Sequence, residues 1–193
     1  MKILQIFGSG RNCGKTTLGC SLLAAFPTTR WIAIKVTPHS HAPAQQHPAA
    51  DQNPQQAKDT DRYLAAGAIA SHLWSGPPDP ARFASFADRA DCLLLETGHA
   101  FAQLPWPLLR VAIAPADPAL WKPGFAERRL QADAQIFTGA DSGFFLRTGP
   151  HPPAPPVFPV ADASVLDPSL HALVARFLAA ASLADSPGSK GRP

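Results

Sequence analysis

Residues 8–17 read GSGRNCGKTT and follow directly on a short apolar run, KILQIF, at 2–7. The run is typical of a buried β-strand, because only Gln5 interrupts its large apolar residues. After the glycines, residues 16–26 predict an amphipathic helix that ends before Pro27. A glycine-rich loop between a strand and a helix can wrap its backbone N–H groups around a phosphate. The stretch therefore predicts a phosphate-binding loop (P-loop).

The residue types at the end of this loop match the chemistry of phosphate binding. Lys15 supplies a positive charge for the β- and γ-phosphate oxygens, and the hydroxyl of Thr16 is placed to ligate Mg²⁺. Thr17 adds a second hydroxyl near the α-phosphate. The alternative is an ordinary glycine-rich turn without a ligand. A lysine at a helix start is unfavourable unless an anion is present, which favours the phosphate site.

Other residues of the loop leave more than one interpretation open. The usual pattern has glycine where this chain has Ser9, so we expect Gly8 and Gly10 to adopt the strained conformations in its place. Arg11 either adds charge near the phosphates or is a solvated residue at the loop tip. Cys13 lies near a helix N-terminus beside a lysine, which favours its thiolate. A small residue chosen for fit is the preferred explanation of Cys13.

The rest of the chain alternates between expected strands and expected helices. Strands are predicted at 31–37, 68–74, 91–97, 109–114 and 134–138, and helices at 59–66, 79–90 and 169–181. This alternation predicts an α/β fold of the P-loop NTPase type, a mostly parallel, doubly wound sheet with helices on both faces. In such sheets ligands bind beyond the carboxyl ends of the strands.

Length and composition predict the domain organisation. The chain of 193 residues suits a single domain, which we place at 1–183, followed by a disordered tail at 184–193. The polar, proline-rich segment 38–57 is expected to be a mobile loop. Residues 149–159 contain six prolines and are expected to be extended.

Charge and cysteine usage restrict the partners and the compartment. The chain has 17 basic and 14 acidic residues, a net charge of +3 that is too small and too scattered to favour nucleic acid. No apolar run reaches the length of about 18 residues that a membrane span needs. Three cysteines at irregular spacing fit a reducing compartment, and the cytoplasm is therefore expected.

Three polar residues lie at ends of expected strands or helices. Glu96 ends a leucine-rich strand, where a carboxylate commonly holds Mg²⁺ or orients water; the alternative is an acid that faces solvent. Lys35 lies at the carboxyl end of another strand and needs an anion there. Asp59 opens a helix and is either part of the site, an N-cap or both.

Two further features concern a polar loop and the base of a nucleotide. His39, His41 and His47 have a spacing that is weak for zinc, so we expect a polar loop that lines a nucleotide or pterin phosphate. The segment IFTGAD at 136–141 is similar to the guanine-reading segment of GTPases, in which Asp141 would accept hydrogen bonds from guanine. An ordinary turn after a strand is the alternative for Asp141.

Four segments in order resemble one family. GKTT at 14–17 is followed by IAIKVTPHSH at 32–41, KDTDRYLAAGA at 58–68 and DCLLLET at 91–97. This order resembles the molybdopterin-guanine dinucleotide biosynthesis protein B (MobB) family, which consists of GTP-binding P-loop proteins. The resemblance covers about the first 100 residues. It implies phosphate and Mg²⁺ binding, a role in molybdenum-cofactor maturation and a homodimer.

The residues of the predicted site follow from the loop and from this resemblance. We assign catalytic roles to Lys15, Glu96 and Asp59, and metal binding to Thr16, Asp59 and Glu96. Nucleotide contacts are expected from Gly10, Arg11, Asn12, Cys13, Gly14, Lys15, Thr16, Thr17, Lys35, His39, His41 and Asp141.

The favoured function is a GTP-binding protein with Mg²⁺ and weak hydrolysis, which serves as an adaptor in molybdopterin-cofactor synthesis. ATP is the alternative nucleotide. One rival is an ATP-dependent small-molecule kinase or ligase, in which Lys35, His39 and His41 would bind the acceptor. The other rival is a non-catalytic nucleotide-binding module.

Overall fold

The computed structural model describes residues 1–37, 59–76, 79–101, 103–139, 157–160, 164 and 166–180. Seven strands form one sheet in the order β3-β2-β4-β1-β5-β6-β7, and every neighbouring pair is parallel. The strands are β1 (Lys2–Gly8), β2 (Trp31–Thr37), β3 (Ala70–Ser75), β4 (Cys92–Thr97), β5 (Leu108–Pro115), β6 (Ala134–Thr138) and β7 (Val157–Val160). The predicted α/β class with a parallel sheet is confirmed.

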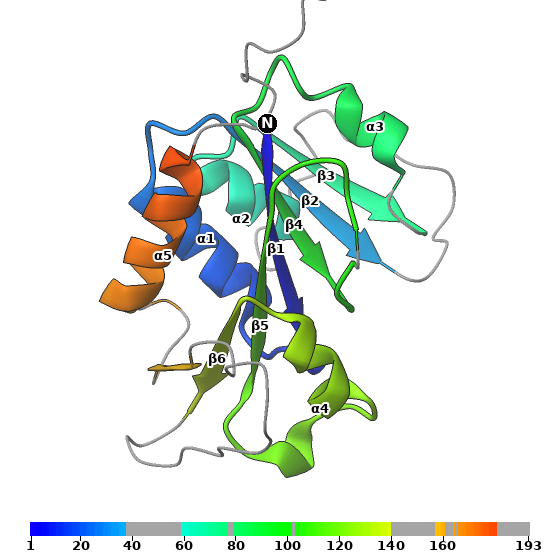
Figure 1. The fold of residues 1–193 in the computed structure, drawn as a ribbon, viewed down its shortest axis with the longest axis vertical. Coiled ribbons are helices and arrows are strands. Elements are labelled where there is room, and N and C mark those ends of the chain that lie inside the picture. Colours follow the sequence, from blue (N-terminus) through cyan, green and yellow to red (C-terminus); the bar gives the residue numbers. More distant parts are fainter. Residues whose placement is uncertain are drawn as a thin grey trace, which may run out of the picture.

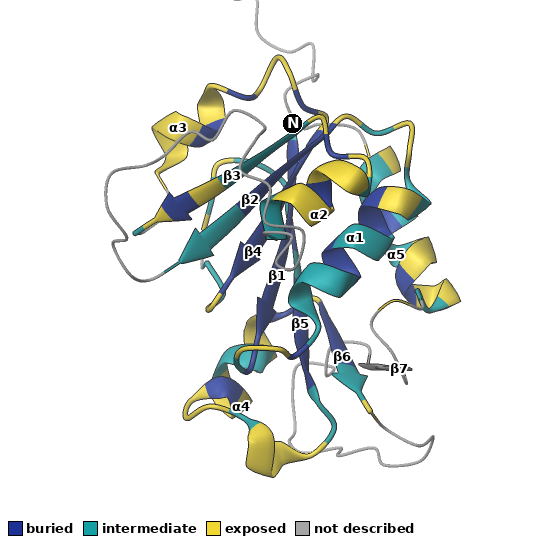
Figure 2. Ribbon diagram, turned by 180° about the vertical axis from the view of Figure 1, so that it is seen from behind, coloured by how far each residue is buried: buried dark blue, intermediate teal, exposed yellow. Residues whose placement is uncertain are grey.

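Helices cover both faces of this sheet (Figures 1 and 2). They are α1 (Lys15–Ala25), α2 (Asp59–Ala65), α3 (Pro80–Ala84), α4 (Phe125–Arg128) and α5 (Pro168–Ala179), with 3₁₀ turns η1 (Pro118–Leu120) and η2 (Arg129–Gln131). Helices α1, α2 and α5 lie on one face, whereas α3 and α4 lie on the other. Such an arrangement is the doubly wound architecture that alternating strands and helices produce.

Strand β1 is buried along its whole length, as its dark colour in Figure 2 shows. Leu4 and Ile6 belong to the core that includes Leu22 of α1, because alternate side chains of a strand point to the same face. The flanking Ile3 and Phe7 belong to the cores on the other face. Packing on both faces fixes the position of β1, including its carboxyl end. The loop that follows β1 therefore starts from a fixed position.

One helix is shorter than the sequence predicts. The pattern at 79–90 predicts a continuous helix, but α3 ends at Ala84. Beyond it, Phe86 N–H donates to the Phe83 carbonyl at 3.0 Å and Ala87 N–H donates to the Ala84 carbonyl at 3.1 Å, which are 3₁₀-type bonds. Both phenylalanines are still buried, because a spacing of three residues keeps them on one side of such a turn.

Several predictions concern residues outside the described ranges. His39, His41, His47 and Asp141 belong to this group, as do the loop 38–57 and the tail 184–193. The proline-rich segment 149–159 is described only from residue 157, where it enters β7. Within the described part of the chain, no helix is long and apolar enough to cross a membrane.

Candidate phosphate-binding site

The loop between β1 and α1 is closely packed at its first glycine. A Cβ on Gly8 would lie 2.4 Å from Cys13 Sγ and 3.1 Å from the Ile113 carbonyl oxygen of β5. Only glycine therefore lets the loop turn back over the end of the sheet at this position. Around Gly10 the space is wider, since the atom nearest to a Cβ there would be Lys122 Cε at 3.7 Å.

The left-handed conformations of the loop occur at other residues than the sequence predicts. Asn12 has φ of 58° and Gly14 has φ of 95°, whereas Gly8 and Gly10 have no positive φ. The expectation that Gly8 and Gly10 take over the strain at Ser9 was therefore wrong. The loop folds around a left-handed Asn12, a residue type that adopts this conformation more readily than most.

Helix α1 begins without a side-chain cap. Its N-cap residue is Gly14, and its first turn contains no acidic residue. By contrast, an aspartate accepts backbone N–H bonds at the start of α3, η1 and α5: Asp79, Asp117 and Asp167 respectively. Uncapped N–H groups and the positive end of the helix dipole favour an anion at the start of α1.

Ser9 is held inside the loop by its backbone. Its N–H donates to the Ile113 carbonyl at 3.1 Å, and its carbonyl accepts from the Lys122 N–H at 3.0 Å. The side chain is buried, and Ser9 Oγ has no hydrogen-bond partner among the described residues. An orphaned buried hydroxyl at the base of the loop fits a site that is completed by a ligand or by water.

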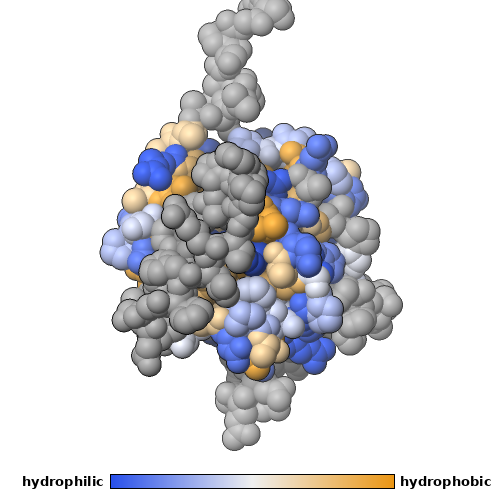
Figure 3. Space-filling view, turned by 60° about the horizontal axis from the view of Figure 1, so that its bottom comes forward, coloured by the Kyte–Doolittle hydropathy of each residue, from blue (hydrophilic) through white to orange (hydrophobic). Residues whose placement is uncertain are grey.

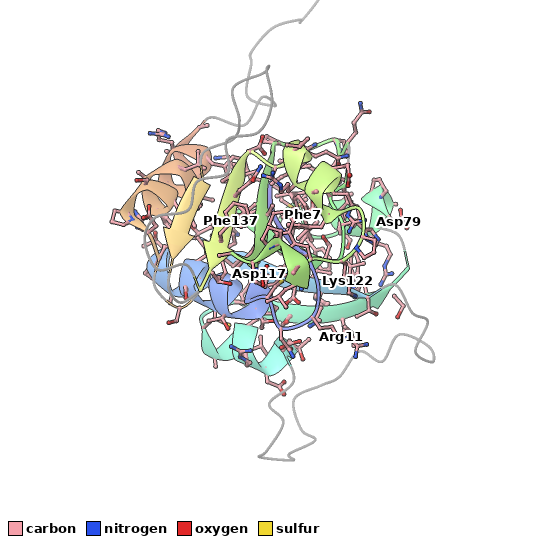
Figure 4. The ribbon with its side chains drawn as sticks, turned by 90° about the horizontal axis from the view of Figure 1, so that it is seen from below. Phe7, Arg11, Asp79, Asp117, Lys122 and Phe137 are labelled. Carbon is pink, nitrogen blue, oxygen red and sulfur yellow. The ribbon has the colours of Figure 1, made fainter. Side chains whose placement is uncertain are left out.

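Lys15 folds back over its own loop. Its ammonium group donates to the Gly10 carbonyl at 2.6 Å and lies 3.4 Å from Cys13 Sγ. The Cys13 thiol is buried and donates to the same carbonyl at 3.3 Å. Its close contact with Gly8 supports the interpretation that Cys13 is present because a small side chain fits there. Arg11 is exposed at the loop tip (Figure 4).

Glu96 is the acid at the centre of the site. Its side chain is only 5% exposed, so it is not an acid that simply faces solvent. The register of the sheet sets Glu96 of β4 opposite Ile6 of β1 and Lys35 of β2. The hydroxyl of Thr16 donates to Glu96 Oε2 at 2.8 Å, and the Tyr63 hydroxyl donates to the same oxygen. Strand β4 and helix α1 are therefore joined at the residues predicted to bind Mg²⁺.

Lys35 pairs with two carboxylates. Its ammonium group lies 3.1 Å from Glu96 Oε1 and also donates to Asp59 at the start of α2. Burial alone would lower the pKa of Lys35, but the hydrogen bond to Asp59 and the charge of Glu96 outweigh it and raise that pKa. Lys35 therefore stays cationic at neutral pH. The other Asp59 oxygen lies 3.8 Å from the Arg62 guanidinium.

Helix α2 reaches the site because α1 has a glycine where the two pack. A Cβ on Gly19 would lie 2.8 Å from Tyr63 Cε1, so only glycine admits the tyrosine ring at this depth. Burial raises the pKa of Tyr63 well above its usual value, and the Glu96 charge adds to this effect. Arg62 also donates to the Thr17 hydroxyl at 3.2 Å. Residues of α2 thus hold Glu96 and Thr17 in place.

The donor set fits Mg²⁺ better than a metal with many protein ligands. Among the described residues, no group of three His, Cys, Asp or Glu side chains is placed to hold a metal ion. Mg²⁺ usually takes one or two protein oxygens and completes its shell with phosphate and water. Thr16 and Glu96 provide such oxygens, whereas Asp59 faces the two cations Lys35 and Arg62.

Four residues of this region were missed by reasoning from the sequence: Tyr63, Arg62, Lys122 and Gln5. Buried Gln5 binds Thr97 Oγ1 at 2.9 Å and the His99 carbonyl at 2.8 Å, and so fixes the chain that follows Glu96. Its polar character within an apolar strand was a usable signal. The other three follow from tertiary packing, for which the sequence has no comparable pattern.

Figure 3 turns the carboxyl ends of the strands forward and shows hydrophilic and hydrophobic residues intermixed among the described side chains of this face. Strand β1, its glycine-rich loop, α1 and the acid of β4 lie together at the carboxyl edge of the parallel sheet of an α/β fold.

No protein-family model matches the chain, and no curated protein matches it. Among solved structures, the crystal structure of Bacillus subtilis MobB is similar, with 19% sequence identity, 92% of this chain and 98% of the other covered, and a TM-score of 0.49. This likeness concerns the fold alone.

Proposed function

We propose that the chain binds a nucleoside triphosphate with Mg²⁺ at the β1–α1 loop and hydrolyses it weakly. The observation that carries this proposal is the hydrogen bond between Thr16 and Glu96, 2.8 Å long, at the uncapped start of α1. It brings the hydroxyl expected at a Mg²⁺ ion next to the acid expected at the same ion. The buried Ser9 hydroxyl without a hydrogen-bond partner among the described residues supports a site at this loop that a ligand completes.

Each group has a separate task in this proposal. The Lys15 ammonium exchanges the Gly10 carbonyl for phosphate oxygens, and the N–H groups at the start of α1 donate to the same anion. Thr16 and Glu96 would hold Mg²⁺, which would neutralise phosphate charge when bound. Asp59 and Lys35 orient Glu96 through the ion pairs described above.

GTP is the proposed nucleotide, and adaptor function in molybdopterin guanine dinucleotide synthesis is the proposed role. Both rest on the resemblance of four sequence segments to the MobB family, which also implies a homodimer and a molybdopterin-cofactor synthesis protein as partner. The proposed compartment is the cytoplasm. Asp141, proposed to read guanine, follows β6 closely in sequence.

The decisive experiment is a calorimetric titration of Mg²⁺–GTP and Mg²⁺–ATP into the full chain and into Lys15→Ala. We expect Lys15→Ala to lower the affinity about 100-fold, because a charge-assisted bond to phosphate is lost. Arg89→Gln is the matched control, since it removes one exposed positive charge from the loop that leads into the amino end of β4.

The outcomes separate the candidate functions. Unchanged affinity in Lys15→Ala would show that the loop is not the site. A preference for ATP over GTP would favour the kinase or ligase alternative. Tight binding without measurable phosphate release would leave the non-catalytic module.

A further inference from the structure

The segment that follows β5 crosses the start of the P-loop. The Lys122 N–H donates to the Ser9 carbonyl at 3.0 Å, which ties the two segments together. The neighbouring Trp121 fixes this segment, because its indole N–H donates to the Pro115 carbonyl at 2.8 Å and its ring stacks on Phe137 at 5.7 Å. The Lys122 backbone is therefore held at one place beside the loop.

The Lys122 side chain lies over Gly10. Its Cγ, Cδ and Cε atoms are 3.7–4.0 Å from the point where a Cβ on Gly10 would be. Figure 4 looks onto the carboxyl edge of the sheet and labels Lys122 and Arg11 on that side of the molecule. The peptide of Gly10 is also the one to which Lys15 donates, so two lysines from different segments meet at the start of the loop.

No carboxylate in the described part of the chain forms an ion pair with Lys122 or Arg11, and both residues are exposed. The nearby acid Asp117 is used as a cap, since its carboxylate accepts from the Ala119 N–H at 2.9 Å. An ordinary exposed lysine is free to move in solvent. Lys122 differs because its backbone is anchored and its stem rests on the loop that is proposed to bind phosphate.

We propose that Lys122 is a second phosphate-binding lysine, which contacts the terminal phosphate and makes the site prefer a triphosphate over a diphosphate. This inference rests on the proposed function. In a P-loop the lysine that matches Lys15 reaches the β- and γ-phosphates. The carbon atoms of the Lys122 side chain lie beside Gly10, whose carbonyl now accepts from Lys15, and its ammonium can therefore reach an anion bound by the loop.

The test compares GTP and GDP affinities, each with Mg²⁺, in the full chain and in Lys122→Met. Methionine keeps most of the apolar stem over Gly10 and removes the charge. Lys122→Arg restores the charge, and Arg89→Gln controls for net charge at a distance. Measurements at about 0.15 M salt screen exposed charges that lie more than about 8 Å away.

We expect Lys122→Met to weaken GTP about tenfold and GDP less than about twofold, whereas Lys122→Arg recovers most of the GTP affinity. Equal weakening of GTP and GDP, or no weakening of either, would overturn the inference. In those cases Lys15→Ala would still abolish tight binding if the proposed function holds. If the unaltered chain binds neither nucleotide, the proposed function itself fails, and this inference fails with it.

Discussion

The two sides of the β1–α1 loop differ in how their charges are satisfied. Toward β4, β2 and α2, the cations Lys35 and Arg62 have carboxylate partners in Asp59 and Glu96. Toward β5, Lys122 and Arg11 have none among the described residues. Both sides are formed at the carboxyl ends of parallel strands, so position in the fold does not explain the difference.

The difference separates two tasks within one site. On the side of β4, β2 and α2, which we call the paired side, Lys35 bridges Asp59 and Glu96. This ion pair orients Glu96 at the proposed metal position. The side toward β5 is called the open side. On the open side, Lys122 and Arg11 have no carboxylate partner among the described residues, and their charge remains available to attract an anion. The paired side should therefore contribute to the stability of the fold, whereas the open side should contribute to binding.

The largest expected effect is that of Glu96→Ala on stability. This change removes the acceptor for the Thr16 and Tyr63 hydroxyls and leaves Lys35 with one acid in place of two. We expect the free energy of unfolding in urea to fall by about 3 kcal/mol. Lys122→Met on the open side should change it by less than about 0.5 kcal/mol. Similar losses from both changes would remove the distinction between the two sides.

The next largest expected effect on the free energy of unfolding is at Gly8, where the loop begins between the two sides. Gly8→Ala sets a Cβ against Cys13 Sγ and against the backbone of β5, which cannot move aside, so we expect a loss of about 2 kcal/mol. Gly10→Ala is the matched control, because its Cβ meets only ordinary contacts with Lys122 and should cost less than about 0.5 kcal/mol. Adding Cys13→Ala to Gly8→Ala should recover part of the loss. A neutral Gly8→Ala in urea denaturation would contradict the packing of the loop.

The paired side also predicts a pH dependence. Burial and the Glu96 charge raise the pKa of Tyr63 in the folded protein above 10, the value expected after unfolding. Stability from Tyr63 is therefore fully present below pH 10 and is lost as the pH rises from there through the folded pKa. The chain has one tyrosine, so tyrosinate absorbance near 295 nm reports this group alone.

We expect a folded midpoint above pH 10 and a midpoint near 10 in urea. Glu96→Gln should lower the folded midpoint without bringing it to the urea value, because burial remains. A folded midpoint equal to that in urea would show that Tyr63 is neither buried nor held against Glu96. The open side has no tyrosine and offers no corresponding titration.

The sequence predicted the elements of the site better than the contacts between them. The strand, loop and helix at 2–26 follow from local patterns of glycine, charge and hydrophobicity, and they occur as expected. Lys35 and Glu96 were predicted separately as strand-end residues, but their pairing depends on the register of β2 and β4. The hydrophobic pattern of each strand favours a register, but β2 and β4 are not consecutive strands, so their pairing also depends on how the intervening elements pack.

Lys122 shows the same limit on the open side. It lies in a loop and turn segment with no distinct pattern, and only the crossing of that segment over Ser9 gives it a place at the site. The left-handed residues were also misplaced, because the sequence argument assigned them to glycines. The actual backbone uses Gly14 together with Asn12, a choice that depends on how the loop closes over Gly8.

The smallest expected effect concerns Asn12, which lies at the exposed rim between the two sides with φ of 58°. Asn12→Gly relieves the left-handed strain but gains freedom in the unfolded chain, so stability should change by less than about 0.5 kcal/mol. Asn12→Ala keeps the strain without the tolerance of asparagine and should cost about 1 kcal/mol. Urea denaturation of both variants separates the effect of the left-handed backbone from the effect of contacts made by the Asn12 side chain. If Asn12→Gly lowers the free energy of unfolding as much as Asn12→Ala does, the Asn12 side chain stabilises the loop through its own contacts. Asn12 would then contribute to stability as the residues of the paired side do.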